Sequence, residues 1–467
     1  MGARDLNNTA WRRRSAIRER LRTFLDRRGY DAVELPTLEQ TDLFLRKSGG
    51  ELAARMYSFT DPSGRSVSLR PEFTSSVVRA YVDGSLRGPL PLRLQYAGPV
   101  FRYEPSADGS GALEYEQLGA ELLGVAGEAA DAEVIALAAQ GLALLGVSGH
   151  RVRISHVGVV NAILEAMGLT ERARVFIHGN LGLLRAEGGA EEARRRAEAL
   201  GILSGGRARR LSALAARLDP DEAREMVEAL FADTVAAGAG QRTPEEILRR
   251  YLKKVREAED PARVERALSF AVGLADAAGE PEAARKRAAE LLAEHNLDDG
   301  LLAPIDRLFD ALGRYDLMGA PLVLDLGATS GIAYYTGVVF EVEHDGVAGA
   351  PPLGGGGRYD GLVKALGEVQ DIPALGFALS LERVSELLSD GFGDADAPSA
   401  GRVLVTAQET AVGQAVATAE RLRAQGIPVE LDLSHDGDAA AAAYAKRRGI
   451  ETIMRVGRDG SVDERPA

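Results

Sequence analysis

The chain of 467 residues contains no cysteine. This absence excludes disulfide bonds, thiolate zinc sites and cysteine nucleophiles. The six histidines are scattered, so we expect neither a metal site nor a cofactor. No apolar run approaches the roughly 18 residues that a transmembrane helix needs, and Arg18, Arg20 and Arg22 stand where a secretory signal would have its apolar core. The sequence therefore predicts a cytoplasmic protein without membrane contact.

Acidic residues outnumber Lys and Arg, 69 to 56, and positive charge is missing from two long stretches. The net charge of −13 opposes binding to nucleic acid, whose affinity depends largely on Lys and Arg contacts with phosphates. Basic runs such as 194–196 and 207–210 lie among Ala, Leu and Glu at helical spacing, which indicates solvated helix faces. Residues 104–149 and 316–357 contain no Lys or Arg at all. We therefore do not expect tRNA as a partner.

Changes in composition predict two domains. Residues 1–390 combine amphipathic helices with alternating strands, and within them about 170–313 is rich in Ala, Arg, Glu and Leu, which indicates a helical insertion. Residues 391–400 are polar and glycine-rich and read as a linker. Residues 401–467 alternate strand and helix patterns, which predicts a small α/β domain.

Periodicity and turn residues predict the individual elements. Helices are expected at 12–29, 131–145, about 379–388, 412–424 and 439–448. Strands are expected at 30–36, 56–61, 67–69, 92–103, 117–124, 322–326, 334–343, 403–406, 429–433 and 452–456. The glycine run between the strand at 334–343 and the helix near 379–388 is expected to be a turn.

Five short motifs run through the chain in a fixed order. They are Pro-Thr-Leu-Glu at 36–39; Leu-Arg-Pro-Glu-Phe-Thr at 69–74; Phe-Arg-Tyr-Glu at 101–104 with Tyr-Glu-Gln-Leu-Gly-Ala-Glu at 115–121; Gly-Ile-Ala-Tyr-Tyr-Thr-Gly at 331–337; and Gly-Arg-Tyr-Asp at 357–360 with Glu-Arg at 382–383. Each alone has an ordinary structural explanation, such as a turn or a helix face. Together they resemble histidyl-tRNA synthetase, a class II aminoacyl-tRNA synthetase, and its non-ligating paralogue, the regulatory subunit of ATP phosphoribosyltransferase.

The resemblance implies an α+β fold, with a class II synthetase-like antiparallel sheet flanked by helices. It implies that residues 401–467 are similar to a shortened anticodon-binding domain, and that the helix at 12–29 with the first motif forms a homodimer interface. The sheet would then carry the amino-acid site.

The resemblance also implies a site for free histidine. The residues that correspond to the family's pocket are Glu72, Thr74, Arg102, Gln117, Glu121, Tyr334 and Tyr335. Glu72, Thr74 and Gln117 would surround the α-ammonium group, and Arg102 would meet the carboxylate. Glu121 and Tyr335 would hold the two imidazole nitrogens, because neutral imidazole presents one donor and one acceptor. The alternative for the two glutamates is that they only satisfy the ends of a sheet or a helix.

Departures from the synthetase pattern remove cations. Ser330 stands where the synthetase has an arginine that helps to activate the carboxylate, and a hydroxyl does not replace a guanidinium. Leu113 stands where the synthetase has a nucleotide-binding arginine, and Phe73 stands where it has a glycine beside the ligand. Arg102 and Arg383 remain as phosphate contacts for a residual nucleotide site. Each lost transition-state donor costs roughly 10²- to 10³-fold in rate, so the departures indicate binding without catalysis.

Two functions from different classes remain. The first is a non-catalytic regulatory subunit that activates a short-form ATP phosphoribosyltransferase and relays histidine as feedback inhibition. Its partners would be free histidine and the catalytic subunit, with the homodimer inside a hetero-oligomer. The second is an active histidine-tRNA ligase. A third alternative is a paralogue that binds a different amino acid, and the sequence does not locate the surface that contacts a partner.

Overall fold

The fold is seen in a computed structural model that describes most of the chain. The described residues are 5–46, 49–103, 113–203, 259–328, 334–344, 351–389, 392, 401–432, 434 and 436–467. They fall into two units, one built from residues 20–387 and one from residues 5–19 with 388–467. Helix α1 (Asn8–Asp26) contains residues of both units.

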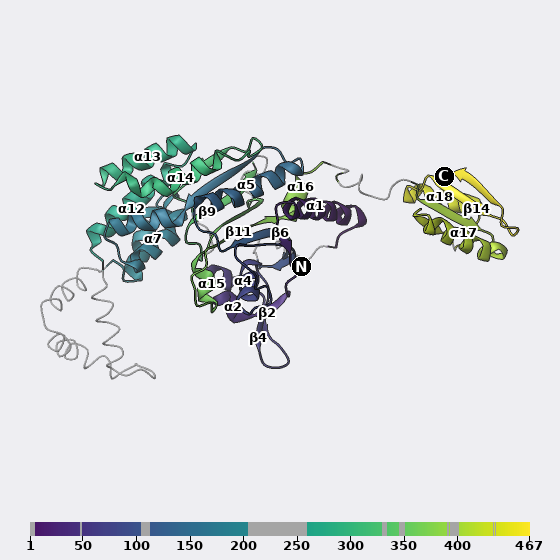
Figure 1. The fold of residues 1–467 in the computed structure, drawn as a ribbon, viewed down its shortest axis with the longest axis horizontal. Coiled ribbons are helices and arrows are strands. Elements are labelled where there is room, and N and C mark those ends of the chain that lie inside the picture. Colours follow the sequence, from purple (N-terminus) through teal and green to yellow (C-terminus); the bar gives the residue numbers. More distant parts are fainter. Residues whose placement is uncertain are drawn as a thin grey trace. The chain divides into compact units, whose positions relative to one another are not determined.

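An eight-stranded sheet forms the centre of the unit built from residues 20–387 (Figure 1). In spatial order its strands are β1 (Asp31–Ala32), β5 (Leu92–Phe101), β6 (Glu114–Leu123), β11 (Ala374–Ser380), β10 (Gly354–Arg358), β9 (Val338–His344), β7 (His150–His156) and β8 (Leu322–Leu324). All neighbouring pairs are antiparallel except β1 with β5 and β7 with β8. The predicted α+β fold with an antiparallel sheet flanked by helices is confirmed.

One prediction about this sheet is wrong. The glycine run expected to form a turn is strand β10, which lies between β9 and β11. The run consists of glycines because the neighbouring strands leave no room for side chains: a Cβ added at Gly356 would overlap the carbonyl oxygen of Gly376. The helix expected near 379–388 is shorter, because β11 continues to Ser380 and α16 (Leu381–Glu386) begins only there. Strand β7 and helix α6 (Val157–Ala166) were not predicted.

The two faces of the sheet have different roles. Arg358 on β10 binds Asp131 of helix α5 (Glu128–Leu144), which packs across β11, β10, β9 and β7. Because side chains alternate along a strand, the neighbouring Gly357 and its partners in register, Gly376 and Glu121, belong to the opposite face. That opposite face carries the candidate site.

The described part of the region at 170–313 is helical. Its helices are α7 (Glu171–Leu184), α8 (Gly189–Ala199), α12 (Pro261–Asp276), α13 (Pro281–Glu294), a 3-10 turn η1 (Asp299–Leu302) and α14 (Ala303–Leu312), and residues 204–258 lie outside the described residues. Asp260 and Glu280 cap α12 and α13, each followed by a proline that is preorganised for the first helical turn. The helices share one apolar core with Leu324 and Leu326, so this region packs directly onto the end of the sheet.

A smaller sheet and four short helices, one of them α3 (Gly49–Ala54), complete this unit. The sheet has the order β2 (Leu38–Gln40), β4 (Ser66–Leu69), β3 (Ser58–Thr60), and residues 61–65 form the turn between β3 and β4. Asp61 accepts hydrogen bonds from the backbone N–H groups of Ser63 and Arg65, which closes the turn. Helices α2 (Thr41–Leu45), α4 (Thr74–Val82) and α15 (Gly361–Ala365) lie nearby (Figure 1).

The second unit contains a four-stranded sheet in the order β13 (Val429–Leu431), β12 (Val403–Ala407), β14 (Thr452–Val456) and β15 (Val462–Pro466). Helix α17 (Val412–Ala424) packs with Val403 and Val405 of β12, whereas α18 (Asp438–Arg448) packs with Leu404. Because alternate residues of one strand face opposite sides, the two helices cover opposite faces. This matches the alternating pattern predicted for the tail, except that β15 was not predicted.

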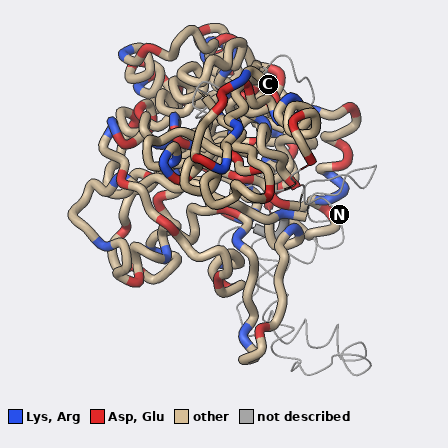
Figure 2. The backbone as a smooth tube through the Cα atoms, turned by 90° about the vertical axis from the view of Figure 1, so that its right-hand side faces the viewer, with Lys and Arg blue, Asp and Glu red and all other residues tan. Residues whose placement is uncertain are grey.

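Charges of both signs are interspersed along the described backbone (Figure 2). No helix among the described residues is long and apolar enough to cross a membrane.

Candidate functional site

A cavity of about 590 Å³ lies on the side of the sheet opposite α5. It collects side chains from segments that are far apart in the sequence. The predicted residues that line it are Glu72, Thr74, Arg102, Gln117, Tyr334, Tyr335 and Arg383. Of the other residues singled out from the sequence, Glu121 and Leu113 do not line the cavity, and Ser330 lies outside the described residues.

Glu72 is held at the start of helix α4. Both of its carboxylate oxygens accept a hydrogen bond from the backbone N–H of Ser75 at 3.1 Å, and the negative charge suits the positive end of the helix dipole. Burial raises the pKa of Glu72, while the hydrogen bonds of Ser75 and the charge of Arg102 oppose that rise. This contact is the helix-capping role that was the alternative for Glu72, and it coexists with a place in the cavity wall.

Glu121 lies directly behind the cavity wall. Its Oε1 accepts hydrogen bonds from Thr74 Oγ1 at 2.7 Å and from the Tyr96 hydroxyl at 3.1 Å, and its Oε2 accepts one from the Tyr359 hydroxyl at 2.5 Å. Thr74, Tyr96 and Tyr359 all line the cavity. Burial raises the pKa of Glu121 to about 7, with a further contribution from Glu72, because the three hydroxyls only partly offset the desolvation.

Glycines on the central strands make room for this arrangement. A Cβ added at Gly376 would overlap Oε2 of Glu121, and one added at Gly119 would lie 2.6 Å from the Tyr96 hydroxyl. The rings of Tyr96, Tyr334 and Tyr359 belong to one buried apolar cluster. Packing therefore fixes the rings, and the missing side chains at 119 and 376 let the hydroxyls reach the carboxylate.

Three arginines line the cavity among the described residues: Arg55, Arg102 and Arg383. Arg102 donates from Nε to the carbonyl of Pro71 at 2.7 Å, and Arg383 donates from Nη1 to the carbonyl of Pro352 at 2.7 Å. Arg55 was missed by sequence reasoning. Its carbonyl accepts a hydrogen bond from the N–H of Tyr103 at 2.8 Å, which brings it beside Arg102. A lone arginine before a hairpin carries no motif that would have identified it.

The positions that depart from the synthetase pattern are only partly seen. Ser330 lies outside the described residues. Leu113 does not line the cavity, and its carbonyl accepts a hydrogen bond from the N–H of Arg102. Phe73 is 2% exposed. Its ring stacks on Tyr96 at 4.3 Å and lies under the guanidinium of Arg70 at 4.0 Å, so the core holds most of this side chain.

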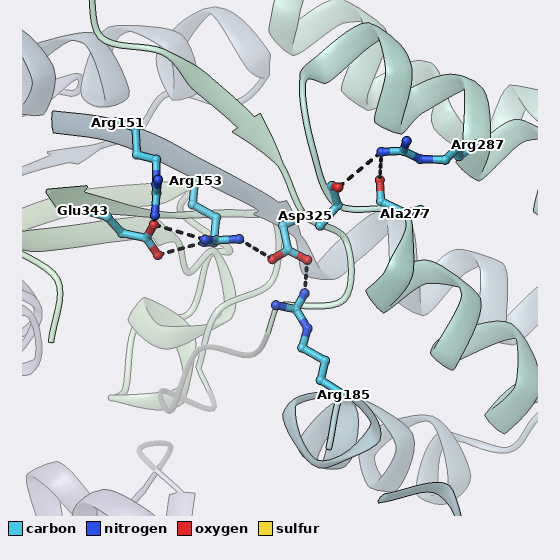
Figure 3. Close-up of polar contacts among 8 residues, drawn as sticks. Arg151, Arg153, Arg185, Ala277, Arg287, Asp325 and Glu343 are labelled. Atoms are coloured by element: carbon cyan, nitrogen blue, oxygen red, sulfur yellow. Dashed lines mark hydrogen bonds and ion pairs between the residues drawn. The ribbon is translucent and has the colours of Figure 1, made fainter. Parts of the chain in front are cut away.

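Figure 3 shows an ion-pair network between the sheet and the helical region. Asp325, which is completely buried, accepts hydrogen bonds from Arg153 of β7 at 2.8 Å and from Arg185 after α7. Arg153 also binds Glu343 at 2.8 Å, and Glu343 binds Arg151. Arg153 is the cross-strand partner of Glu341, which lines the cavity. The network therefore joins the sheet to the helical region at 170–313.

Burial and the neighbouring charge of Glu343 raise the pKa of Glu341, and Arg153 opposes the rise. The cavity thus combines acids and hydroxyls with three arginines, at residues 55, 102 and 383. Among the described residues, no group of three or more His, Cys, Asp or Glu side chains is arranged to hold a metal ion. The arrangement suits a small ligand with a cationic or N–H-bearing part and an anionic part.

Comparisons with known proteins agree with this geometry. Residues 2–246 and 225–384 match the histidyl-tRNA synthetase family. A histidine-tRNA ligase of Rhodococcus opacus is 32% identical over 449 residues, which cover 95% of this chain and 85% of the relative. A histidine-tRNA ligase of Mycobacterium tuberculosis is 32% identical over 448 residues, with the same coverage.

Two solved structures show the same fold. One, from Bacillus halodurans, is described as an ATP phosphoribosyltransferase regulatory subunit/histidyl-tRNA synthetase; it has a TM-score of 0.65, is 24% identical and covers 97% of each chain. The other is a histidyl-tRNA synthetase from Nostoc, with a TM-score of 0.62 and 15% identity over 100% of this chain and 96% of that one. This chain therefore belongs to the histidyl-tRNA synthetase family.

Proposed function

We propose that this chain binds free histidine in the cavity and acts as a non-catalytic regulatory subunit of ATP phosphoribosyltransferase in the cytoplasm. It would activate a short-form catalytic chain and relay histidine as feedback inhibition. The observation that carries the proposal is that acids, hydroxyls and arginines line one cavity. A zwitterionic amino acid whose side chain bears an N–H donor offers partners to all three kinds of group.

The missing cations support the regulatory part of the proposal. Residues 316–357, which include Glu341 and the positions around Ser330, contain no Lys or Arg. Adenylate formation needs fixed positive charge around the reacting phosphate, and roughly 10²- to 10³-fold in rate depends on each donor. Feedback control needs only that histidine binds two states of the assembly unequally.

The second unit also supports a role that does not involve tRNA. Residues 401–467 carry nine Lys or Arg and ten Asp or Glu. Several of the arginines are already paired with acids of the same unit, among them Arg402 and Arg448 with Glu430, and Arg455 with Asp438. Binding a phosphate backbone would require these pairs to open, which reduces the gain from each contact.

A second candidate is an active histidine-tRNA ligase. It is favoured by the names of the relatives at 32% identity and by the third arginine in the cavity, Arg55. In this case Arg55, Arg102 and Arg383 would hold ATP beside the amino acid. The positive charge would come from residues other than those expected in the family.

Reconstitution tests the proposal. The chain is mixed with a short-form catalytic subunit of ATP phosphoribosyltransferase from the same genome, and phosphoribosyl transfer is measured with and without histidine. The proposal predicts activation on mixing and inhibition by histidine in the mixture only. Failure to activate, together with charging of tRNA by this chain alone, would establish the second candidate instead.

A further inference from the structure

One segment of the chain runs from the helical region to the cavity. It begins with β8, the edge strand of the large sheet, which exchanges backbone hydrogen bonds with Gly279 between α12 and α13. Further along, Gly327 packs so closely on α12 that an added Cβ would lie 2.5 Å from the Cα atom of Ala275. The same segment leads to Tyr334 and Tyr335, which line the cavity. The helical region therefore holds the chain shortly before these two cavity residues.

Asp325 fastens this segment to two different parts of the unit (Figure 3). Its Oδ2 accepts a hydrogen bond from Arg153 of β7 at 2.8 Å, and its Oδ1 accepts one from Arg185, which directly follows α7. The backbone N–H of Asp325 also donates to the carbonyl of Ile154 at 2.8 Å. Because the side chain is completely buried, losing either arginine leaves a charge that water solvates poorly. One carboxylate thus joins the sheet to the helical region.

Arg153 extends the connection to the cavity wall. It is paired in register with Glu341, which lines the cavity, so the two side chains lie on the same face of the sheet. Its Nε and Nη2 donate to Glu343, and its Nη1 donates to Asp325. Arg153 therefore acts on Glu341 through its charge, which opposes the rise that burial causes in the pKa of Glu341. Where Arg153 lies depends in turn on Asp325.

We propose that Arg185 is a positioning residue for the cavity, which couples the helical region at 170–313 to the cavity wall through Asp325. The inference rests on the proposed function and deepens it, because it names the helical region as the element that responds when histidine occupies the cavity. The coupling is positive. Arg185 preorganises the cavity wall, and a ligand that requires this arrangement strengthens the hold of the helical region in return.

The first test is calorimetric titration of the full chain with L-histidine. Arg185→Ala is expected to weaken histidine binding by about 2- to 30-fold, the range over which single residues change the coupling between sites. Asp325→Asn removes the charge that Arg185 binds but keeps the size of the side chain. Because Arg185 acts through Asp325, adding R185A to D325N should weaken binding no further. Unchanged affinity in R185A, or an equal further loss in the double variant, overturns the inference.

Arg194→Ala is the matched control. Arg194 also lies in the helical region and binds a carboxylate, that of Glu265 on α12 at 2.6 Å, and its side chain is 36% exposed, as is that of Arg185. Its partners Glu191 and Glu265 do not line the cavity. R194A is expected to leave the affinity for histidine unchanged. A loss as large as that in R185A would show a general loosening of the helical region and overturn the inference.

Hydrogen exchange measures the coupling in the opposite direction. Because coupling between two sites is reciprocal, histidine is expected to slow the amide exchange of α7 in the wild type by up to the factor by which R185A weakens binding. In R185A this effect of histidine should be lost. A side chain that only stabilised the fold would change exchange equally with and without histidine. Histidine that binds the wild type and leaves the exchange of α7 unchanged overturns the inference.

A comparison without ligand separates this inference from the proposed function. Peptides covering residues 334–344 report on the cavity wall, since they contain Tyr334, Tyr335 and Glu341. Their amides are expected to exchange about 2- to 30-fold faster in R185A than in the wild type and at the wild-type rate in R194A. Equal exchange in R185A and the wild type overturns the inference, whether or not histidine binds. Failure of histidine to bind, with faster exchange in R185A, would instead remove the proposed function and leave the link between the helical region and the cavity.

Discussion

Glu121 and Asp325 are both fully buried acids in the same unit, but they are satisfied in opposite ways. Asp325 binds two guanidinium groups, from Arg153 and Arg185. Glu121 binds three neutral hydroxyls. Both have their oxygens occupied, yet only Asp325 has its charge balanced. The comparison shows that hydrogen bonds alone do not remove the electrostatic cost of a buried carboxylate.

The difference assigns a role to each acid. A carboxylate held by two arginines is tied down, and here it joins strand β7 to the helical region (Figure 3). A buried carboxylate that is held only by neutral hydroxyls has no cation beside it to offset its charge, and burial raises the pKa of Glu121 to about 7. A cationic or N–H-rich ligand in the cavity would stabilise the ionised carboxylate. We therefore regard Asp325 as structural and Glu121 as functional.

The largest expected effect comes from removing the side chain of Asp325, the acid that two arginines bind. Asp325→Ala leaves Arg153 and Arg185 facing a vacated buried position, and loss of one partner of a buried pair typically costs about 4 kcal/mol. The free energy of unfolding from urea titration should fall by that amount. Asp306→Ala is the control, because Asp306 pairs with Arg285 at the surface, where a pair contributes at most about 1 kcal/mol. Equal losses in the two variants would contradict the structural role.

The free energy of unfolding should depend on pH through the titration of Glu121. The pKa of Glu121 is raised from 4.5 to about 7 in the folded chain, so the folded state holds this proton more tightly. The protonated group therefore stabilises the fold fully below about pH 4.5, and this contribution is lost as the pH rises through 7. Its full size is up to about 3 kcal/mol, at 1.36 kcal/mol for each pKa unit.

E121Q removes this titration. The free energy of unfolding of E121Q minus that of the wild type should therefore rise between pH 5 and pH 8. Glu133→Gln provides the baseline, because Glu133 accepts a hydrogen bond from the Tyr30 hydroxyl but does not line the cavity. A difference that stays flat across this range would mean that Glu121 is not strained by its burial.

Removing the charge of Arg102, which lines the cavity, is expected to give the next largest effect. Arg102→Gln is expected to weaken histidine binding by about 10- to 100-fold, because a hydrogen bond to a charged group contributes about 1.5 to 3 kcal/mol. Calorimetry measures the change. Arg87→Gln is the control, since Arg87 pairs with Glu368 and does not line the cavity. Unchanged affinity in R102Q would mean that the carboxylate of histidine does not bind Arg102.

The smallest expected effect comes from replacing Arg185, one of the two arginines that bind Asp325. Arg185→Gln should lower the free energy of unfolding by only about 1 kcal/mol, because Asp325 keeps its bond to Arg153 and the amide can still donate. Thermal unfolding is sensitive enough to detect this loss. Arg195→Gln, on the exposed face of α8, should leave the melting temperature unchanged. A loss in R185Q as large as in Asp325→Ala would mean that Arg185 alone holds the acid.

Much of the fold could be predicted from the sequence, because a regular spacing of apolar residues indicates which segments form helices and strands. The helix at 412–424 and the strand at 452–456 were predicted to the residue. The run at 354–357 was not, since a glycine run indicates a turn unless the closeness of the neighbouring strands is known. Motif order also gathered most of the predicted site residues, which do line the cavity. Arg55 and Tyr96 were missed, because the first has no motif and the second resembles any apolar residue of a buried strand.

Pyrophosphate exchange with ATP, measured at high protein concentration with and without L-histidine in samples whose histidine binding is followed by calorimetry, tests the central claim most directly. We predict saturable histidine binding without histidine-dependent exchange, because Ser330 and Leu113 stand where the synthetase pattern has arginines. Rapid exchange that requires histidine would contradict the account and identify the chain as a ligase.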